Sequence, residues 1–106
     1  MPYVASGYVN QAQLGPIIDE AARALGPDVV HIAYGLGPDS TSEPSIFFRI
    51  LLADEAIREE TISDLTGRIA SALFDAVHPI ENWGLRPYFN FRSRSEQDRR
   101  RDPAWG

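Results

Sequence analysis

Apolar residues recur at helical spacing in two segments of the chain. Between Thr61 and Val77 they fall three or four positions apart, so they line one face of a helix. The segment from Pro16 to Leu25 shows the same spacing, begins with a proline that suits a first helical turn and stops before Gly26-Pro27. The pattern therefore predicts two amphipathic helices.

Three other segments have the composition of β-strands. Val29 to Leu36 and Ile46 to Ala53 are rich in aliphatic and aromatic residues, and the turn-forming residues 37–44 separate them. His78-Pro79 ends the second helix, because a residue before proline avoids the α conformation. A third strand is predicted from Leu85 to Arg92.

The order of these elements, α-β-β-α-β, predicts an α+β fold of two layers. In this fold a three-stranded antiparallel-type sheet carries two helices on one face. If residues 3–9 form a further strand, the order becomes β-α-β-β-α-β, which is ferredoxin-like. We expect residues 1–92 to form a single α+β domain and residues 93–106 to form an arginine-rich C-terminal tail. A chain of 106 residues is long enough for one hydrophobic core.

Alternation within the strands sorts their side chains onto two faces. One face is apolar throughout and is expected to pack against the helices: Val30, Ile32, Tyr34, Leu36, Ile46, Phe48, Ile50, Leu52, Leu85, Pro87, Phe89 and Phe91. The opposite face mixes aromatic, aliphatic and arginine side chains: His31, Ala33, Phe47, Arg49, Leu51, Arg86, Tyr88, Asn90 and Arg92. Such a mixture is typical of a partner-binding surface. The candidate partner-binding residues of the strands are Phe47, Arg49, Leu51, Tyr88 and Arg92.

Two helices leave this opposite face open, and three kinds of cover are to be considered. The C-terminal tail or the N-terminal arm folds over it, a second copy pairs with it sheet to sheet, or a different protein binds there. Trp105 is a large apolar group near the chain end. It either docks on its own domain or anchors a partner, and we include it among the candidate partner-binding residues.

The charge is unevenly distributed along the chain. Residues 1–91 carry twelve acids and five arginines, a net of −7, whereas residues 92–106 carry five arginines and three acids, a net of +2. An acidic body makes nucleic acid an unlikely partner, because affinity for nucleic acid comes mainly from contacts with phosphates. The sequence has no cysteine and no apolar run of about 20 residues. We therefore expect a small soluble protein of the cytoplasm that does not interact with a membrane.

Residue types that carry catalysis are sparse. His31 lies in a predicted strand near Arg49, which disfavours a general base, and His78 suits the end of a helix. Gly35-Leu36-Gly37 is predicted as a plain turn, because no helix follows it to bind a phosphate. We expect no catalytic residue, no cofactor and no metal site, and we predict that the protein is not an enzyme.

The order α-β-β-α-β resembles that of the small domains of the KH type. This resemblance implies an alternative, a nucleic-acid-binding domain that uses Arg49, Arg86, Arg92 and the run Arg99 to Arg101. The glycine-containing loop with which KH domains clamp phosphates is not visible in the sequence. A small-molecule-binding regulatory domain is a third interpretation.

The interpretation that we prefer is a non-enzymatic protein-protein interaction module. Such a module is either a homo-oligomer or the small accessory, antitoxin-like partner of another protein. It would bind through the open sheet face and the C-terminal tail, which carry the aromatic and arginine side chains described above.

Overall fold

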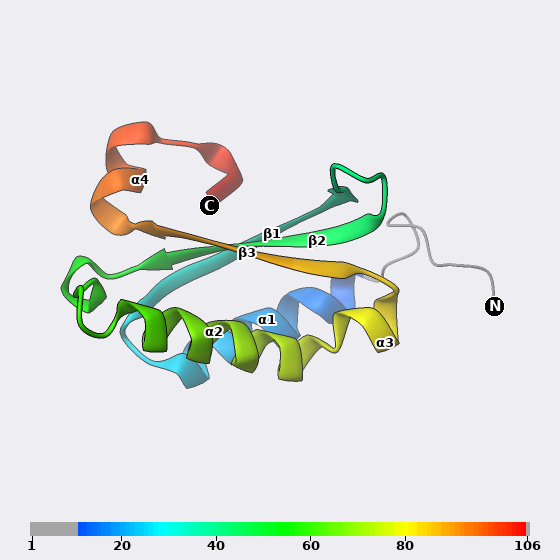
Figure 1. The fold of residues 1–106 in the computed structure, drawn as a ribbon, viewed down its shortest axis with the longest axis horizontal. Helices are drawn as coiled ribbons and strands as arrows, with labels where there is room; N and C mark the ends of the chain where they lie inside the picture. Colours follow the sequence, from blue (N-terminus) through cyan, green and yellow to red (C-terminus); the bar gives the residue numbers. More distant parts are fainter. Residues whose placement is uncertain (1–10, 106) are drawn as a thin grey trace.

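The two long helices lie side by side on one face of a three-stranded sheet, which gives the fold two layers (Figure 1). The structure is a computed structural model that describes residues 11–105, so the strand considered for residues 3–9 lies outside the described residues. The helices are α1 (Gln11–Leu25) and α2 (Ile62–Val77), and the strands are β1 (Val29–Pro38), β2 (Pro44–Leu52) and β3 (Arg86–Ser93). The predicted α+β class with two helices on one face is confirmed.

The sheet is mixed rather than antiparallel. Its strand order is β1-β2-β3, with β1 and β2 antiparallel but β2 and β3 parallel. The expected antiparallel pairing therefore holds for β1 and β2 alone. The reason lies in the connection, because a tight turn reverses the chain after β1, whereas α2 carries it back along the sheet after β2. The chain consequently enters β3 at the end of the sheet where β2 began.

The helices differ from the predicted ones at their ends. Helix α1 begins five residues before Pro16, which therefore lies in its interior. Leu14 and Ile18 are both buried, so the apolar stripe that holds this helix on the sheet starts before the proline. Helix α2 ends where His78 takes up a left-handed conformation with φ of 47°. A short helix that was not predicted, α3 (Pro79–Trp83), follows it.

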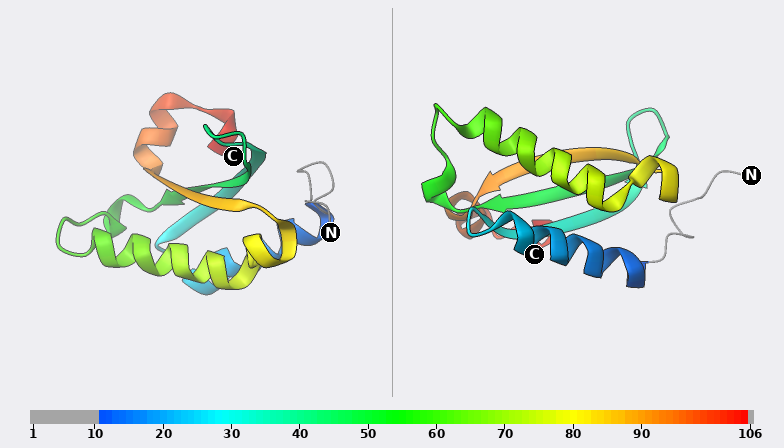
Figure 2. Two further views of the ribbon diagram at one scale, coloured as in Figure 1. Left: turned by 45° about the vertical axis from the view of Figure 1, so that its right-hand side comes forward. Right: turned by 90° about the horizontal axis from the view of Figure 1, so that it is seen from below.

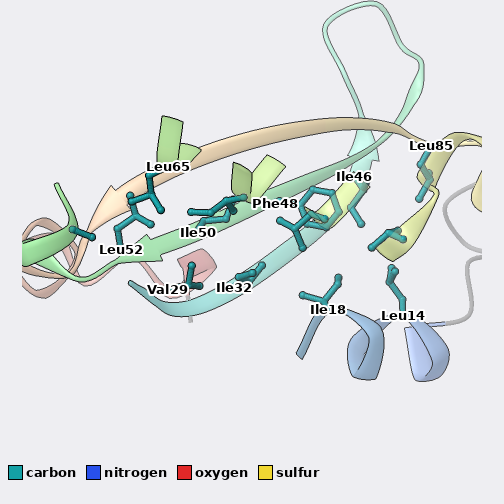
Figure 3. Close-up of a cluster of buried hydrophobic side chains, with 14 residues drawn as sticks. Leu14, Ile18, Val29, Ile32, Ile46, Phe48, Ile50, Leu52, Leu65 and Leu85 are labelled. Atoms are coloured by element: carbon teal, nitrogen blue, oxygen red, sulfur yellow. The ribbon is translucent and has the colours of Figure 1, made fainter. Parts of the chain in front are cut away.

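The hydrophobic core fills the space between the helices and the sheet (Figure 3). Its buried members are Leu14, Ile18, Val29, Ile32, Ile46, Phe48, Ile50, Leu52, Ala56, Leu65, Ile69, Leu73, Val77 and Leu85. One predicted core position is wrong, since Val30 is 38% exposed and Val29 is buried instead. The pairing of β1 with β2 shifts between Val29 and His31. Such a bulge adds an unpaired residue and reverses the alternation on one side of it.

The end of the chain crosses to the other side of the sheet. Helix α4 (Arg94–Arg100) and the 3₁₀ turn η3 (Pro103–Trp105) lie opposite α1 and α2, as both views in Figure 2 show. Ser93 caps α4 by accepting a hydrogen bond from the Glu96 amide. Another 3₁₀ turn, η2 (Asp54–Ala56), follows β2. Of the helices between residues 11 and 105, none is long and apolar enough to cross a membrane.

We predict that Leu73→Ala lowers the free energy of unfolding by about 2–5 kcal/mol, because the side chain is fully buried and its removal leaves a cavity. Ile80→Ala is the matched control, since Ile80 is 54% exposed on α3 and should cost less than about 1 kcal/mol. Urea denaturation of both variants measures the difference. Equal losses would contradict the position of the core.

Candidate functional site

The sheet face turned away from α1 and α2, which we call the second face, carries the strand residues singled out from the sequence. Strand pairing arranges them in rows across β1, β2 and β3. From the α4 end, these rows are His31-Leu51-Arg92, Ala33-Arg49-Asn90, Gly35-Phe47-Tyr88 and Gly37-Ser45-Arg86. The structure therefore brings Phe47, Arg49, Leu51, Tyr88 and Arg92 together on one surface.

The tail covers the end of the second face where β3 finishes. Nη1 of Arg92 donates a hydrogen bond of 2.8 Å to Oε1 of Gln97 and lies 3.8 Å from Oδ2 of Asp102. The guanidinium carbon of Arg92 lies 4.3 Å from the ring centre of Trp105, which is a cation–π contact. Gln97 also donates a hydrogen bond of 2.6 Å to the carbonyl of Asp102. Arg92 therefore holds the tail folded back over the sheet.

Trp105 docks on its own domain, which is one of the two alternatives considered from the sequence. Its side chain is 7% exposed, and η3 packs against β1 and β2. Leu51 lies at the same end of the second face, in the row of Arg92, and is only 6% exposed because the tail covers it. The Arg92 side chain is 13% exposed. The part of these three residues in partner binding stays a prediction, and little of their surface is available in this conformation.

A second contact fixes the start of the tail. The amide of Ser95 donates a hydrogen bond of 3.1 Å to Oδ1 of Asp54, and its hydroxyl donates to Oδ2 of the same carboxylate. These bonds, with the hydroxyl bond the stronger cause, lower the pKa of Asp54 below its usual range. Helix α4 is thus attached to the segment after β2 as well as to β3.

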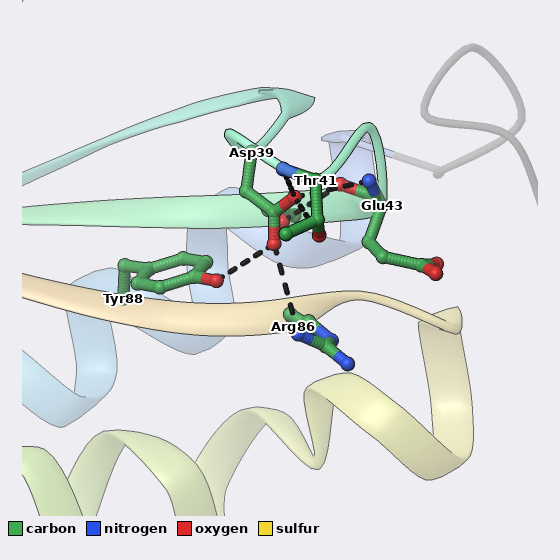
Figure 4. A network of polar contacts seen from close by, with 6 residues as sticks. Asp39, Thr41, Glu43, Arg86 and Tyr88 are labelled. Atoms are coloured by element: carbon green, nitrogen blue, oxygen red, sulfur yellow. Dashed lines mark hydrogen bonds and ion pairs between the residues drawn. The ribbon is translucent and has the colours of Figure 1, made fainter.

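The opposite end of the second face is closed by the loop between β1 and β2 (Figure 4). Asp39 in this loop accepts hydrogen bonds of 2.7 and 2.8 Å from the hydroxyl and amide of Thr41 and one of 3.0 Å from the amide of Glu43. The hydroxyl of Tyr88 donates a further bond of 2.7 Å to Oδ2 of Asp39. Nη1 of Arg86 lies 3.9 Å from the same oxygen. The loop is therefore tied to β3 across the sheet.

These contacts stabilise the ionised form of Asp39. The Thr41 hydroxyl and then the Tyr88 hydroxyl are the main causes that hold the pKa of the Asp39 carboxyl far below its usual range. The same hydrogen bond raises the pKa of Tyr88, because the phenol proton is shared with an anion. The Asp39 side chain is 5% exposed, so its negative charge is satisfied within the protein.

Between these two ends lies the part of the second face that we call the central patch. It consists of Ala33, Gly35, Phe47, Arg49, Tyr88 and Asn90. The rings of Phe47 and Tyr88 stack with their centres 5.3 Å apart and their planes 15° apart. Tyr88 is 37% exposed and Asn90 is also exposed. The central patch thus presents a stacked aromatic pair to solvent.

Arg49 lies across the central patch. A Cβ atom built on Gly35 would lie 2.7 Å from Nη1 of Arg49, 3.2 Å from Nη2 and 3.4 Å from the guanidinium carbon, so the Nη1–Nη2 end of the guanidinium points at Gly35 on β1. Arg49 is half-buried. Within the part of the chain that the structure describes, no hydrogen bond, ion pair or ring contact involves its side chain.

Gly35 and Asp39 also belong to this face, although the sequence pattern did not indicate them. Gly35 falls within the predicted strand Val29 to Leu36, but the sequence analysis assigned Gly35-Leu36-Gly37 to a plain turn, whereas Gly35 is part of β1 and pairs with Phe47. The pattern that would have identified Gly35 is a glycine in one strand that lies one row from an arginine on the same face of the neighbouring strand. Asp39 is the acid of a dense turn segment, and nothing in that segment indicates that its partner lies 49 residues further along.

A different surface feature lies on the far side of the helices. An apolar groove of about 610 Å³ runs between α1 and α2, and Ala21, Ala24, Ala72 and Ala76 are among its lining residues. Ala24 is exposed there. The groove carries no cation and no aromatic side chain among its lining residues.

Comparison of the chain with protein-family models, with curated proteins and with solved structures finds no match in any of the three. Function has to be inferred from this chain's own residues. Residues 11–105 contain no group of three histidine, cysteine or acidic side chains arranged to hold a metal ion. His78 instead pairs with Glu81 at 3.1 Å on the surface of α3.

We predict that Asp39→Asn lowers the free energy of unfolding at pH 7. A carboxyl with a depressed pKa stabilises the fold above its unfolded pKa of about 3.9, and that stability is lost as the pH falls through the folded pKa. The difference between the wild type and the variant should therefore shrink below about pH 4. Urea denaturation at several pH values measures it.

The control for this prediction is Glu59→Gln, because Glu59 is exposed and makes no ion pair among residues 11–105. It should leave the pH dependence of unfolding close to that of the wild type. An Asp39→Asn variant whose loss of stability is the same at every pH would show that the carboxylate charge is not what holds the loop.

Proposed function

We propose that this chain is a non-enzymatic protein-interaction module that binds another protein through the central patch. The observation that carries the proposal is the Arg49 guanidinium, a half-buried cation without an acidic partner among the described residues, beside the partly exposed Phe47-Tyr88 stack. Arginine and tyrosine are enriched at the centres of protein interfaces, where both give large directional contacts.

The frame around the central patch supports this proposal. Arg92 and Asp54 hold the tail at one end, and Asp39 holds the β1–β2 loop at the other end through Tyr88. Side chains that are already fixed lose little entropy when a partner binds, so more of the contact energy contributes to affinity. The tail thus acts as the border of the interface in this proposal rather than as its main anchor.

The same patch favours a different protein over a second copy as the partner. A dimer that pairs sheet to sheet around a two-fold axis through the central patch would place two Arg49 side chains close together. Like charges at the centre of an interface oppose association unless an anion lies between them. A small accessory protein that binds another chain is therefore the form of the proposal that we prefer, with self-association as its alternative.

The nucleic-acid alternative loses support from the ion pairs made by three of the six arginines on which it relies. Arg86 and Arg92 lie within 4 Å of carboxylates, and Arg100 lies 3.0 Å from Glu96. Phosphate binding depends on cations that are free to replace counterions. The lack of cysteine in the chain supports a cytoplasmic location as a further part of the proposal.

We predict that a photo-reactive benzoylphenylalanine in place of Asn90 crosslinks to another protein in the native host, because Asn90 is exposed in the central patch. The matched control carries the same residue in place of Ala24, in the groove between α1 and α2. Mass spectrometry identifies the crosslinked adducts. The expected result is a defined adduct at position 90 that is absent at position 24.

Adducts that form at position 24 alone would move the interface to the helical side and contradict the proposal. An adduct at position 90 that contains a second copy of this chain would establish self-association instead. A crosslink from position 90 to nucleic acid would favour the alternative function.

A further inference from the structure

Arg49 differs from the other arginines of the second face in one respect. Arg86 lies 3.9 Å from Asp39, and Arg92 lies 3.8 Å from Asp102, so each of these cations has a carboxylate beside it. Arg49 sits between them on the central strand, is half-buried, and has no carboxylate within ion-pair distance among the described residues. Partial burial of a cation is costly unless a partner compensates the lost hydration.

The position of the Arg49 guanidinium depends on Gly35. With no side chain at position 35, the guanidinium points its Nη1–Nη2 end at this residue, because a Cβ atom there would meet Nη1 at 2.7 Å and Nη2 at 3.2 Å, both nearer than the guanidinium carbon at 3.4 Å. The end that carries Nη1 and Nη2 is thus turned toward β1, and the side edge of the guanidinium is formed by Nε and one Nη. Such a side edge binds a carboxylate through two parallel hydrogen bonds.

We propose that Arg49, held in place over Gly35, is a carboxylate-binding subsite, and that the partner is a protein whose extended segment presents an aspartate or glutamate to it. This inference rests on the proposed function and names the chemistry of the partner. The partner's carboxylate takes the place that Asp39 and Asp102 occupy beside the other two arginines. The stacked rings of Phe47 and Tyr88 provide the apolar surface for the residues next to that acid.

The charges around Arg49 favour a single protein carboxylate over the phosphate chain of a nucleic acid as the bound anion. A nucleic acid presents a row of phosphates and needs several free cations along its path. The neighbours of Arg49 on its row are Ala33 and Asn90, which are uncharged. One guanidinium between uncharged neighbours matches one carboxylate in an otherwise uncharged segment.

Glycine substitutions separate the position of the guanidinium from its charge. Gly35→Ala keeps Arg49 but forces its flexible end to move, and the backbone at this position is compatible with alanine. Gly37→Ala is the matched control, because Gly37 lies on the same strand and the same face, and a Cβ atom added there would have nothing within 4 Å. Both variants are expected to keep the fold, which thermal unfolding verifies.

The test selects binders from a library of random short peptides displayed on phage, using the full-length wild-type chain as bait. We expect the selected peptides to share one acidic position. Replacement of that acid by its amide, Arg49→Gln in the chain, or Gly35→Ala should each weaken binding roughly 10–100-fold, as expected for a hydrogen-bonded charge. Gly37→Ala should change the dissociation constant less than about two-fold.

The possible outcomes separate this inference from the proposed function. Selected peptides without a shared acidic position would overturn the carboxylate subsite and leave the interaction module standing. A wild-type chain that selects no peptide would contradict the proposed function itself. Equal weakening by Gly35→Ala and Gly37→Ala would also overturn the subsite, because the effect would then belong to the strand.

Two further measurements address other occupants of the central patch. Fluorescence polarisation with labelled single-stranded RNA is expected to show no binding that depends on Arg49, and such binding would overturn the carboxylate in favour of a phosphate. Light scattering over a range of concentrations is expected to give the same mass for the wild type and Arg49→Gln. A dimer that Arg49→Gln dissociates would identify the occupant as a second copy.

Discussion

The contact between Arg92 and Trp105 determines how much of the sheet is open to a partner. Arg92 stands near the end of β3 and joins Gln97, Asp102 and the indole ring in one cluster. Without this cluster, the bonds between Ser95 and Asp54 would fix only the start of the tail, and the residues after α4 would lose the contacts with Arg92 that hold them over β2 and β1. With it, the tail covers the row that contains Leu51 and leaves the next rows uncovered. The central patch is therefore defined by where the tail stops.

The direction of β3 decides which arginine meets which acid. Because β3 runs parallel to β2, Arg86 lies at the end with the β1–β2 loop and Arg92 lies at the end where the tail begins. Asp39 and Asp102 are then in reach of one arginine each. Arg49, in the middle of β2, is left without an acid from either end among residues 11–105. An antiparallel β3 would reverse this assignment and give the patch a different charge pattern.

The sequence contains enough local information to predict the elements and the face of most strand residues. Helical spacing located α2 to within one residue, and alternation placed Phe47, Arg49 and Tyr88 on one surface. The features that were wrong or missed depend on contacts between distant residues or on local irregularity. The direction of β3 is set by the crossover connection through α2, and the exposure of Val30 by a bulge in the pairing of β1 with β2. Trp105 docks on the cation of Arg92, which precedes it by thirteen positions.

The claim on which the account depends is that the tail folds back onto the sheet through Arg92 and Trp105. A double-mutant cycle tests it directly, with the free energies of unfolding measured for the wild type, Arg92→Ala, Trp105→Ala and the double variant. The contact at 4.3 Å predicts that the sum of the two single losses exceeds the loss in the double variant by about 0.5–2 kcal/mol. Strictly additive losses would show that the two side chains do not interact, and the covered and uncovered parts of the second face would then have to be redrawn.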